Sequence, residues 1–284
     1  MPALFQPAKA ATRKPLLLSW SGGKDSAWAL HLLRQSLDYE VVALLTTVNE
    51  KFRRVAMHGF REELLDLQAE AAGLPLWKVD LPFPCSNADY EARMATVCAR
   101  AVSEGLHGIA FGDLFLEDIR AYRIARLAGT GLEPVFPVWC PSLGVSTAEL
   151  AQQMLTSGLR AHLTCIDPRH LSPSFAGRTF DANLLADLPP SVDPCGERGE
   201  FHTFTFAGPM FRRTIPVLPG ERVERDNFIY ADLLPFPGPQ SLSPDDVPLP
   251  STPEDRNAGP ARAGLHPRGA CADALASRLA GLRV

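Results

Sequence analysis

Residues 16–26, LLLSWSGGKDS, decide the fold of this chain. Three leucines precede two glycines, a lysine and hydroxyl side chains, and the apolar residues of the next segment, 27–33, recur at helical spacing. This order predicts a strand, a tight loop and a helix. Gly22 and Gly23 lack a Cβ atom, so the loop backbone can turn sharply and approach a ligand closely.

The loop at residues 21–26 has the composition of a phosphate site. The N–H groups of such a loop and of the first helical turn converge on one point, where the helix dipole favours negative charge. Lys24 adds a mobile cation, and Ser21 and Ser26 add hydroxyl donors. A Walker A loop requires Ser or Thr after its lysine, whereas Asp25 stands there, and the Gly-x-Gly-x-x-Gly spacing of dinucleotide-binding loops is absent. The loop therefore predicts a phosphate site of another kind; the alternative is a glycine turn that binds nothing.

Composition is typical of a soluble globular protein. The chain has 284 residues, 46% of them hydrophobic, and a formal net charge of −4, which gives no global basic field for nucleic acids. No apolar run approaches the roughly 18 residues of a membrane span, and residues 1–5 lack the pattern of a signal peptide. We therefore expect a cytoplasmic protein without a membrane or nucleic-acid partner, and a homodimer stays open.

Apolar runs alternate with helical patterns between residues 15 and 141, which is typical of a parallel sheet covered by helices. We expect strands at 16–20, 40–48, 76–81, 107–111 and 133–139, and helices at 24–37, 60–72, 87–104 and 116–127, with Asn87 as an N-cap and Gly73 and Gly105 as helix ends. The predicted fold class is α/β, with a doubly wound parallel sheet. Ligands bind beyond the carboxyl ends of such strands, so the loop at 21–26, the connection at 49–59 and Gly112-Asp113 are expected to share one cleft.

The pattern changes after residue 141. A helix at 147–156, a short strand at 161–166 and a strand that starts at residue 201 indicate a second, smaller α+β domain over residues 142–234. We expect residues 1–14 to be a disordered lead-in and the proline-rich residues 235–284 to be a disordered tail, with a short helix at 272–282.

A charged segment follows the fourth predicted strand. It contains Gly112 and Asp113 and, on a predicted helix, Asp118, Arg120 and Arg123. Asp113 or Asp118 could hold Mg²⁺, which prefers one or two carboxylates together with phosphate oxygens. Arg120 or Arg123 could bind a phosphate or a carboxylate through a bidentate fork. The alternative is a solvated charged helix face, the usual role of such runs.

Residues 193–203, DPCGERGEFHT, are too polar for a core strand and too rich in reactive side chains for a linker. The candidate site residues in this segment are Cys195, Gly196, Glu197, Glu200, His202 and Thr203. Its two glycines are typical of a backbone that approaches a ligand closely; the alternative is a tight turn that leads into a strand. No two of the six cysteines have the Cys-x-x-Cys spacing of a zinc or redox site.

His58 is a further candidate, because the connection that contains it is expected to face the glycine loop. A single histidine is more often a structural or surface residue, and that alternative stays open.

Three segments together resemble one known family. They are SGGKDS at 21–26, FGDLFLEDIRAYR at 111–123 and DPCGERGEFHTF at 193–204, and they are similar to the motifs of the diphthine–ammonia ligases, which are N-type ATP pyrophosphatases of the PP-loop (adenine nucleotide alpha hydrolase) superfamily. The first motif is shared across that superfamily, and the last is the specific one. The resemblance covers about residues 15–234, and Arg198 departs from the asparagine expected in relatives.

The resemblance implies a Rossmann-like PP-loop fold and an enzyme that uses ATP and Mg²⁺. Such an enzyme adenylates a substrate carboxylate, releases pyrophosphate and aminates the adenylate with free ammonia. By this resemblance, ATP would bind at Ser21, Gly22, Gly23, Lys24, Asp25, Ser26, Gly112 and Asp113, and the catalytic residues would be Lys24, Asp25, Glu197, Glu200 and His202. The substrate would contact His58, Asp118, Arg120, Arg123, Cys195, Gly196 and Thr203, and Mg²⁺ would contact Asp113 and Asp118. Whether the acid is a small molecule or is carried by a protein stays open.

Two other functions stay open on the same fold. A PP-loop enzyme that thiolates tRNA would need a reactive cysteine, for which Cys195 is the candidate, and a basic RNA-binding face that the composition does not indicate. A sensor that binds ATP without turnover would not require the polar segment at 193–203. The fold is common to all three functions and cannot decide between them.

Overall fold

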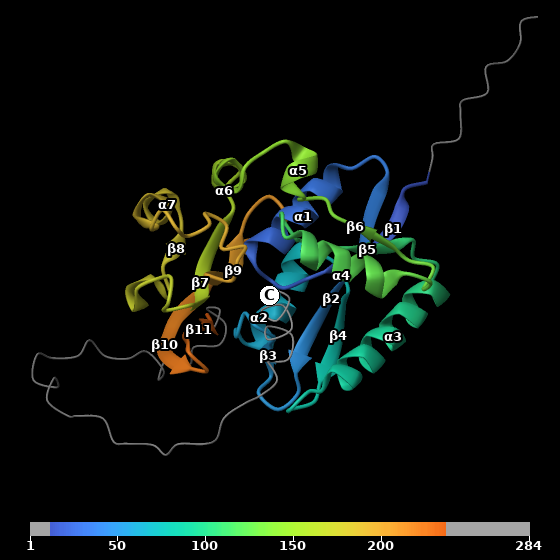
Figure 1. The fold of residues 1–284 in the computed structure, drawn as a ribbon, viewed down its shortest axis with the longest axis horizontal. Coiled ribbons are helices and arrows are strands. Elements are labelled where there is room, and N and C mark those ends of the chain that lie inside the picture. Colours follow the sequence, from blue (N-terminus) through green and yellow to red (C-terminus); the bar gives the residue numbers. More distant parts are fainter. Residues whose placement is uncertain (1–11, 237–284) are drawn as a thin grey trace, which may run out of the picture.

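The computed structural model describes residues 12–236. Residues 1–11 and 237–284 lie outside the described residues, and with them most of the predicted lead-in, the predicted proline-rich tail and the predicted helix at 272–282. The described part contains two β-sheets with helices around them (Figure 1).

The first sheet is mainly parallel, with β1 at its centre. Its strands are β1 (Lys14–Ser19), β2 (Tyr39–Asn49), β3 (Arg54–Val55), β4 (Leu76–Leu81), β5 (Gly108–Ala110) and β6 (Glu133–Val135). Strand β1 pairs in parallel with β2 and β5, β4 and β6 extend the sheet outward, and only β3 is antiparallel, at the end of β2. The predicted α/β fold with a parallel sheet is confirmed.

Helices cover both faces of this sheet. They are α1 (Lys24–Gln35), α2 (Glu62–Ala72), α3 (Asn87–Ser103) and α4 (Glu117–Leu127). Leu16 and Leu18 of β1 belong to the core cluster that includes Leu64 of α2, whereas Leu17 belongs to a second cluster with Ala101 of α3. Because successive side chains of a strand point to opposite faces, the sheet is buried on both faces and doubly wound.

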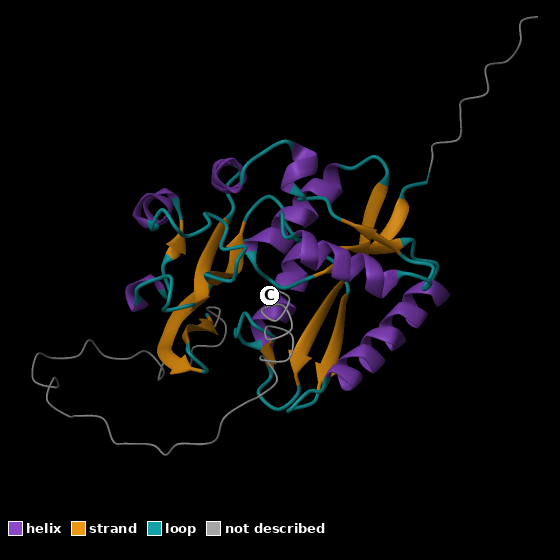
Figure 2. Cartoon of the chain, in the orientation of Figure 1, coloured by secondary structure: helices purple, strands orange, loops and turns teal. Residues whose placement is uncertain are grey.

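The second sheet is antiparallel and shares a core with the first. Its strands are β7 (Arg160–Ile166), β8 (Thr179–Phe180), β9 (Phe201–Ala207), β10 (Val217–Arg225) and β11 (Phe228–Pro235), accompanied by α5 (Cys140–Leu143), α6 (Thr147–Thr156), the 3₁₀ turn η1 (Pro173–Phe175) and α7 (Ala182–Asp187). Phe204 of β9 packs against Phe60, with 4.9 Å between ring centroids, in the cluster that also contains Leu16. One apolar core therefore connects the two sheets that Figure 2 shows.

The ends of two helices follow from local sequence. Gly73 adopts φ +66° and ends α2, as predicted. The N-cap of α3 is Ser86 and not Asn87 as predicted, because Ser86 and Asp89 form a reciprocal capping box.

The last strand of the first sheet is shorter than predicted. The sequence predicts a strand over 133–139, whereas β6 ends at Val135 and the short helix α5 begins at Cys140. Pro137 lies beyond the strand, since it has no N–H to donate to a neighbouring strand. The sequence analysis also did not predict β3, β8, β10, β11 or α7. The division of the chain into two domains between residues 141 and 142 stays a prediction.

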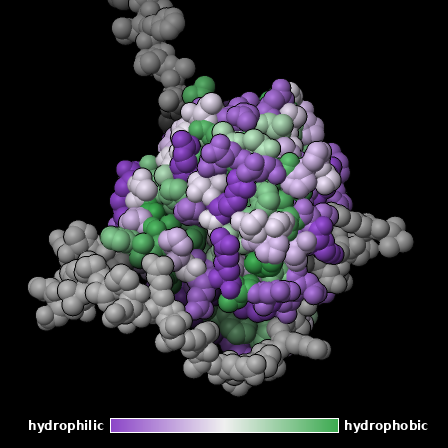
Figure 3. Space-filling view, turned by 90° about the vertical axis from the view of Figure 1, so that its left-hand side faces the viewer, coloured by the Kyte–Doolittle hydropathy of each residue, from purple (hydrophilic) through white to green (hydrophobic). Residues whose placement is uncertain are grey.

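The molecular surface on the side of the second sheet has mixed hydropathy. Hydrophilic and hydrophobic side chains alternate across the face seen in Figure 3. Among residues 12–236, no helix is long and apolar enough to cross a membrane.

We expect Phe204→Ala to lower stability strongly, because Phe204 is fully buried where the two sheets meet. Removing a buried phenylalanine side chain costs about 3–5 kcal/mol. Thermal unfolding of the variant measures the loss. Leu37→Ala is the control, since the Leu37 side chain is 88% exposed, and an equal loss in both variants would contradict the assigned core.

Candidate active site

The predicted phosphate loop connects β1 to α1, and its glycines are required by close packing. Gly22 has φ +76°, and a Cβ atom there would lie 2.4 Å from Cζ of Phe60 and 2.6 Å from Oε1 of Gln68. A Cβ atom on Gly23 would lie 2.6 Å from Cε1 of His58. The side chains around the loop thus occupy the space that any larger residue would need.

Gln68 of α2 ties the loop to both sheets. Its Oε1 accepts a hydrogen bond from Nε1 of Trp20 at 3.0 Å, and its Nε2 donates to the carbonyl oxygens of Gly22 at 2.9 Å and Thr205 at 2.7 Å. The N–H of Thr205 also donates to the Gly22 carbonyl oxygen, at 2.9 Å. Sequence reasoning missed this fully buried residue. The available signal was an amide side chain on the apolar face of α2, next to Leu64 and Leu65 in the helix pattern.

Hydroxyl groups bind the start of α1. Thr203 of β9 accepts a hydrogen bond from the N–H of Lys24 at 3.0 Å, and Ser21 accepts one from the N–H of Gly23 at 3.3 Å. The hydroxyls of Ser21 and Ser26 lie 3.2 Å apart. Thr203 belongs to the second sheet, and its side chain therefore fixes the first turn of α1.

The ammonium group of Lys24 is buried and not mobile, which corrects the sequence expectation. It donates to both carboxylate oxygens of Asp25 at 2.9 Å and to the carbonyl oxygen of Cys195. It also lies 5.4 Å from the centroid of the Phe201 ring and 5.7 Å from that of Phe180. Burial alone would lower the pKa of Lys24, but the neighbouring Asp25, Cys195 and Glu197 raise it above the usual value. The site therefore contains a permanently charged, fixed cation.

Asp193 and Glu200 organise the segment at 193–203. The carboxylate of Asp193 accepts hydrogen bonds from the Thr147 hydroxyl at 2.7 Å and from the N–H groups of Cys195 at 2.9 Å and Glu197 at 3.3 Å. The buried carboxylate of Glu200 accepts from the N–H groups of Asp193 and Arg198, both at 3.0 Å. These contacts assign Glu200, a predicted catalytic residue, to holding the turn. Asp193 is the first residue of the motif at 193–204, but the sequence analysis did not name it as a site residue.

Glu197 has the electrostatics of an acid–base group. One carboxyl oxygen accepts a hydrogen bond from the N–H of Leu114 at 2.8 Å. Burial, together with the negative charges of Asp25 and Asp113, raises the pKa of Glu197 to about 8. This carboxyl group therefore exchanges a proton near neutral pH, which an ordinary glutamate does not.

His58 and His202 form a pair of neutral imidazoles beside the loop. Their ring centroids lie 4.9 Å apart, and Nδ1 of His58 donates to the carbonyl oxygen of Thr203 at 2.9 Å. Burial, reinforced by the charge of Lys24, lowers the pKa of His58 to about 4 and that of His202 to about 3. Both rings are uncharged at neutral pH and can accept a proton or a hydrogen bond only through an unprotonated nitrogen.

In the segment after β5, the first residues lie against the glycine loop and the later ones do not. A Cβ atom on Gly112 would lie 2.9 Å from the backbone nitrogen of Ser26, so the two backbones are in close contact. Arg123 of α4 pairs with Asp113 at 3.4 Å. The side chain of Asp118 is exposed, and within residues 12–236 no hydrogen bond or ion pair joins it to the loop. Gly112 therefore lies against the loop, whereas no such contact within residues 12–236 joins Asp118 to it, and the shared cleft stays a prediction.

The cysteines near the site are not reactive thiolates. Cys195 is buried, and its thiol donates to the carbonyl oxygen of Thr147 at 3.3 Å. Burial raises the pKa of Cys195 well above its usual value and that of Cys140 to about 11. A nucleophilic cysteine needs the opposite shift.

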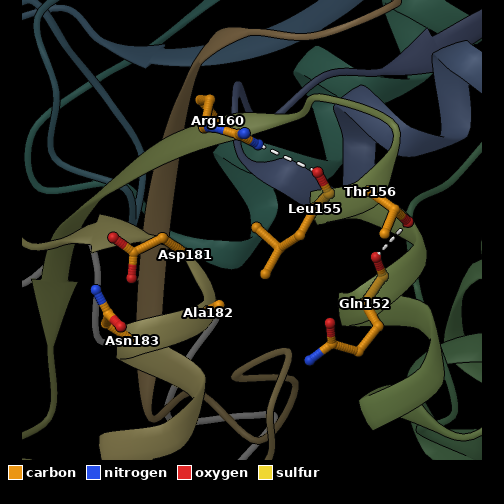
Figure 4. Close-up of a pocket in the computed structure, with 7 residues that line it drawn as sticks. All are labelled: Gln152, Leu155, Thr156, Arg160, Asp181, Ala182 and Asn183. Atoms are coloured by element: carbon orange, nitrogen blue, oxygen red, sulfur yellow. Dashed lines mark hydrogen bonds between the residues drawn. The ribbon is translucent and has the colours of Figure 1, made fainter.

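One pocket lies apart from these residues. It is lined by Gln152, Leu155, Thr156, Arg160, Asp181, Ala182 and Asn183 (Figure 4). Arg160 in it donates to the carbonyl oxygens of Leu155 and Leu159, and Asp181 accepts from the N–H of Leu184. Its charged groups therefore serve the ends of α6 and α7, and none of the predicted site residues lines it.

Comparison with known proteins identifies one family. Residues 15–129 match the family model of the diphthamide synthase N-terminal domain, and residues 146–232 match that of the diphthamide synthase C-terminal domain. A diphthine–ammonia ligase of Danio rerio is 28% identical over 241 residues, which cover 74% of this chain and 89% of that protein. The diphthine–ammonia ligase of Homo sapiens is 24% identical over 220 residues, which cover 69% of this chain and 80% of that protein.

Glu197→Gln should remove a pH dependence of stability. The pKa of Glu197 is about 8 in the folded protein, whereas the ordinary value for a glutamate, which applies to the unfolded chain, is 4.5. Between these two pH values the folded protein keeps a proton that the unfolded chain has lost, so the stability of the wild type falls as pH rises. Glutamine does not titrate and still accepts the Leu114 hydrogen bond. We expect the melting temperature of the variant, relative to wild type, to rise as pH increases from 4.5 to about 8.

Thermal unfolding across that pH range provides the measurement. Glu63→Gln on the exposed side of α2 serves as the control, because it should give a constant difference from wild type. A flat profile for Glu197→Gln would show that Glu197 is ionised in the same range as an exposed glutamate.

Gln68→Leu should loosen the phosphate loop. The leucine has a similar volume, but it leaves the indole of Trp20 and the carbonyl oxygen of Thr205 without their hydrogen-bond partner. Each unpaired buried group costs about 1–3 kcal/mol. We expect a lower melting temperature and weaker ATP binding by calorimetry. Exposed Gln35→Leu is the matched control, and wild-type ATP affinity in Gln68→Leu would contradict the anchoring role.

Proposed function

Because the chain belongs to the diphthamide synthase family, we propose that it adenylates a substrate carboxylate with ATP and then aminates it with ammonia. It is an ATP-dependent ligase, as its curated relatives are. The names of those relatives specify diphthine and ammonia as their substrates. For this chain we propose ammonia and a carboxylic acid, with diphthine as one candidate acid.

The observation that carries this proposal is the direct attachment of the phosphate loop to the segment at 193–203. Lys24 contributes its ammonium group to the Cys195 carbonyl oxygen and its backbone N–H to Thr203. Two parts of the chain more than 170 positions apart thus form one site. A protein that only bound phosphate would not need, at that junction, a glutamate such as Glu197 whose pKa lies near neutral pH.

In the first step, a carboxylate oxygen of the substrate attacks the α-phosphorus of ATP. A new O–P bond forms, the bond to the β,γ-pyrophosphate breaks, and pyrophosphate leaves with the bonding electrons. The N–H groups of Gly23 and Lys24 are bound by Ser21 and Thr203, so the other backbone N–H groups of residues 21–26 would bind the phosphates. The fixed charge of Lys24 would stabilise the negative charge in the transition state. The contacts of Gln68 and Thr203 hold these groups in position before the substrate arrives.

In the second step, the lone pair of ammonia attacks the carbonyl carbon of the acyl adenylate. The C–N bond forms, the C–O bond to AMP breaks, and the nitrogen loses a proton. Glu197 has a pKa near 8, so its ionised form can accept that proton at neutral to slightly basic pH. The ring of His202 is neutral and too weak a base to take up that proton, so we propose that it orients the ammonia by accepting a hydrogen bond.

Mg²⁺ is the proposed metal. Among residues 12–236 no cluster of three or more metal-ligating side chains exists, but Mg²⁺ with a nucleotide needs only one or two carboxylates besides the phosphates. Asp113 fits this role, since it adjoins Gly112 at the loop and is only partly neutralised by Arg123 at 3.4 Å. When bound, Mg²⁺ would neutralise phosphate charge and favour departure of pyrophosphate.

The two alternative functions have weaker support. Thiolation of tRNA would need a thiolate, but the raised pKa of Cys195 keeps its thiol protonated. A sensor would not need Glu197 to titrate near neutral pH. We therefore favour the ligase.

The test is ATP turnover with Mg²⁺ and ammonium in the presence of carboxylic acids, with AMP and ADP resolved. We expect AMP and pyrophosphate that depend on an acid. Glu197→Gln should lower kcat by about 10²-fold or more, as loss of an acid–base group does, with little change in ATP binding. Glu63→Gln is the control. Formation of ADP in place of AMP would contradict the pyrophosphatase mechanism.

A further inference from the structure

The turn that carries His58, residues 54–61 (the His58 turn), has a tight and strained backbone. The N–H of Gly59 donates to the carbonyl oxygen of Val55 at 3.0 Å, which closes the turn. Met57 has φ +62° although it is not a glycine. Such a conformation persists where the surrounding structure holds it in place. The His58 turn therefore depends on contacts from other parts of the chain.

The carboxylate of Asp232 in β11 binds two arginines of the His58 turn. Its Oδ1 accepts a hydrogen bond from Nη1 of Arg54 at 2.8 Å, and its Oδ2 accepts one from Nη2 of Arg61, also at 2.8 Å. Nε of Arg61 lies 3.2 Å from Oδ2 and 3.3 Å from Oδ1. The Asp232 side chain is only 16% exposed, and bidentate pairs of this kind are stronger than ordinary surface ion pairs.

The two arginines keep Asp232 charged. Burial alone would raise the pKa of Asp232, but the hydrogen bonds from Arg54 and Arg61 lower it below the usual value. The carboxylate is therefore ionised at neutral pH, and both of its oxygens accept hydrogen bonds from the His58 turn.

Arg54 and Tyr230 extend this attachment to the residue next to His58. Nη1 of Arg54, which binds Asp232, also donates to the carbonyl oxygen of Gly59 at 2.6 Å. A Cβ atom on Gly59 would lie 2.6 Å from Cδ1 of Tyr230, so the backbone of Gly59 packs directly on that ring. Tyr230 and Asp232 are two positions apart on β11 and face the same side of the strand. One face of β11 thus holds the turn by a carboxylate and by a ring.

The ring of His58 connects the turn to the phosphate loop. A Cβ atom on Gly23 would lie 2.6 Å from Cε1 of His58, and Nδ1 of His58 donates to the carbonyl oxygen of Thr203 at 2.9 Å. The ring centroids of His58 and His202 lie 4.9 Å apart. Burial, reinforced by the charge of Lys24, lowers the pKa of His58 to about 4. The place of this ring therefore depends on where the His58 turn is held.

We propose that Asp232 is a positioning residue of the site. Through its two arginines it holds the His58 turn against β11, and it thereby keeps the His58 ring packed against the phosphate loop and His202. The consequence for catalysis rests on the proposed function, in which His202 orients the ammonia, whereas the placement of the ring does not. Small displacements of reacting groups are costly, since about 1 Å can lower a rate by about 10²-fold.

The test is a titration of the His58 ring by NMR, with isotope-labelled histidine and with His58→Gln to assign its signal. In Asp232→Asn one oxygen is left to serve two arginines, so we expect the turn to loosen and the ring to gain contact with water. The pKa of His58 should then rise from about 4 toward its ordinary value of 6.5. Arg54→Gln removes the link to Gly59 and should shift the pKa in the same direction.

Asp187→Asn is the matched control, because Asp187 also pairs with an arginine, Arg178, at 2.7 Å, and that arginine lies outside the His58 turn. It should leave the titration of His58 as in the wild type. An unchanged pKa of His58 in Asp232→Asn would overturn the proposal, and so would an equal rise in Asp187→Asn. If Asp232→Asn does not fold, Arg54→Gln, which retains the pair of Arg61 with Asp232, decides by the same criterion.

Turnover separates this inference from the proposed function. With an acid that the wild type converts with release of AMP, Asp232→Asn should lower kcat about tenfold or more, and Asp187→Asn should keep the wild-type kcat. A wild-type kcat in Asp232→Asn would overturn the positioning role even if the titration of His58 had shifted. If the wild type forms no AMP with any acid, the ligase proposal has failed, and the titration alone decides whether Asp232 positions His58.

Discussion

The ion pair between the buried ammonium group of Lys24 and the half-buried carboxylate of Asp25 is the interaction on which the rest of this site depends. A charged amine is costly to remove from water unless it gains strong partners. Lys24 finds them in the adjacent carboxylate and in the carbonyl oxygen of Cys195, which belongs to a distant segment. The phosphate loop is therefore complete only when residues 193–203 are folded against it, and the same contact fixes a positive charge where phosphate is proposed to bind.

The backbone of the loop is constrained in the same way. The carbonyl oxygen of Gly22 accepts hydrogen bonds from Gln68 of α2 and from Thr205 of β9, and Thr203 of β9 binds the N–H of Lys24. Strand β9 thus supplies hydroxyl and backbone groups to a loop that belongs to the first sheet. A shared apolar core, with Phe60 against Phe204, holds the sheets at the required separation. Preorganisation of this kind removes the need to order the loop when the substrate binds.

Burial also determines which side chains can transfer protons. Glu197 keeps its proton to a pKa of about 8, whereas His58 and His202 stay neutral far below neutral pH. Desolvation is the largest cause in all three and acts in opposite directions on acids and bases, because it always disfavours the charged form. The site thus combines one permanent cation with three groups that are uncharged or partly charged at neutral pH. Such a set suits a reaction that creates negative charge at phosphorus and releases a proton from nitrogen.

The sequence alone determined the parallel α/β sheet, the glycine loop between β1 and α1 and the family, because these follow from short-range patterns: apolar runs of strand length, helical spacing and three motifs with fixed residue order. It also identified Glu197, His58 and Thr203 as candidates. It did not determine that Lys24 is buried and fixed, that Glu200 binds only backbone N–H groups within its turn, or that Gln68 joins the two sheets. Nor could it distinguish paired Arg123 from weakly paired Arg120 on the same helix. Those properties depend on which atoms lie within a few ångströms after residues far apart in the chain have come together. Charge, burial and hydrogen bonding at these distances are decided by the tertiary structure.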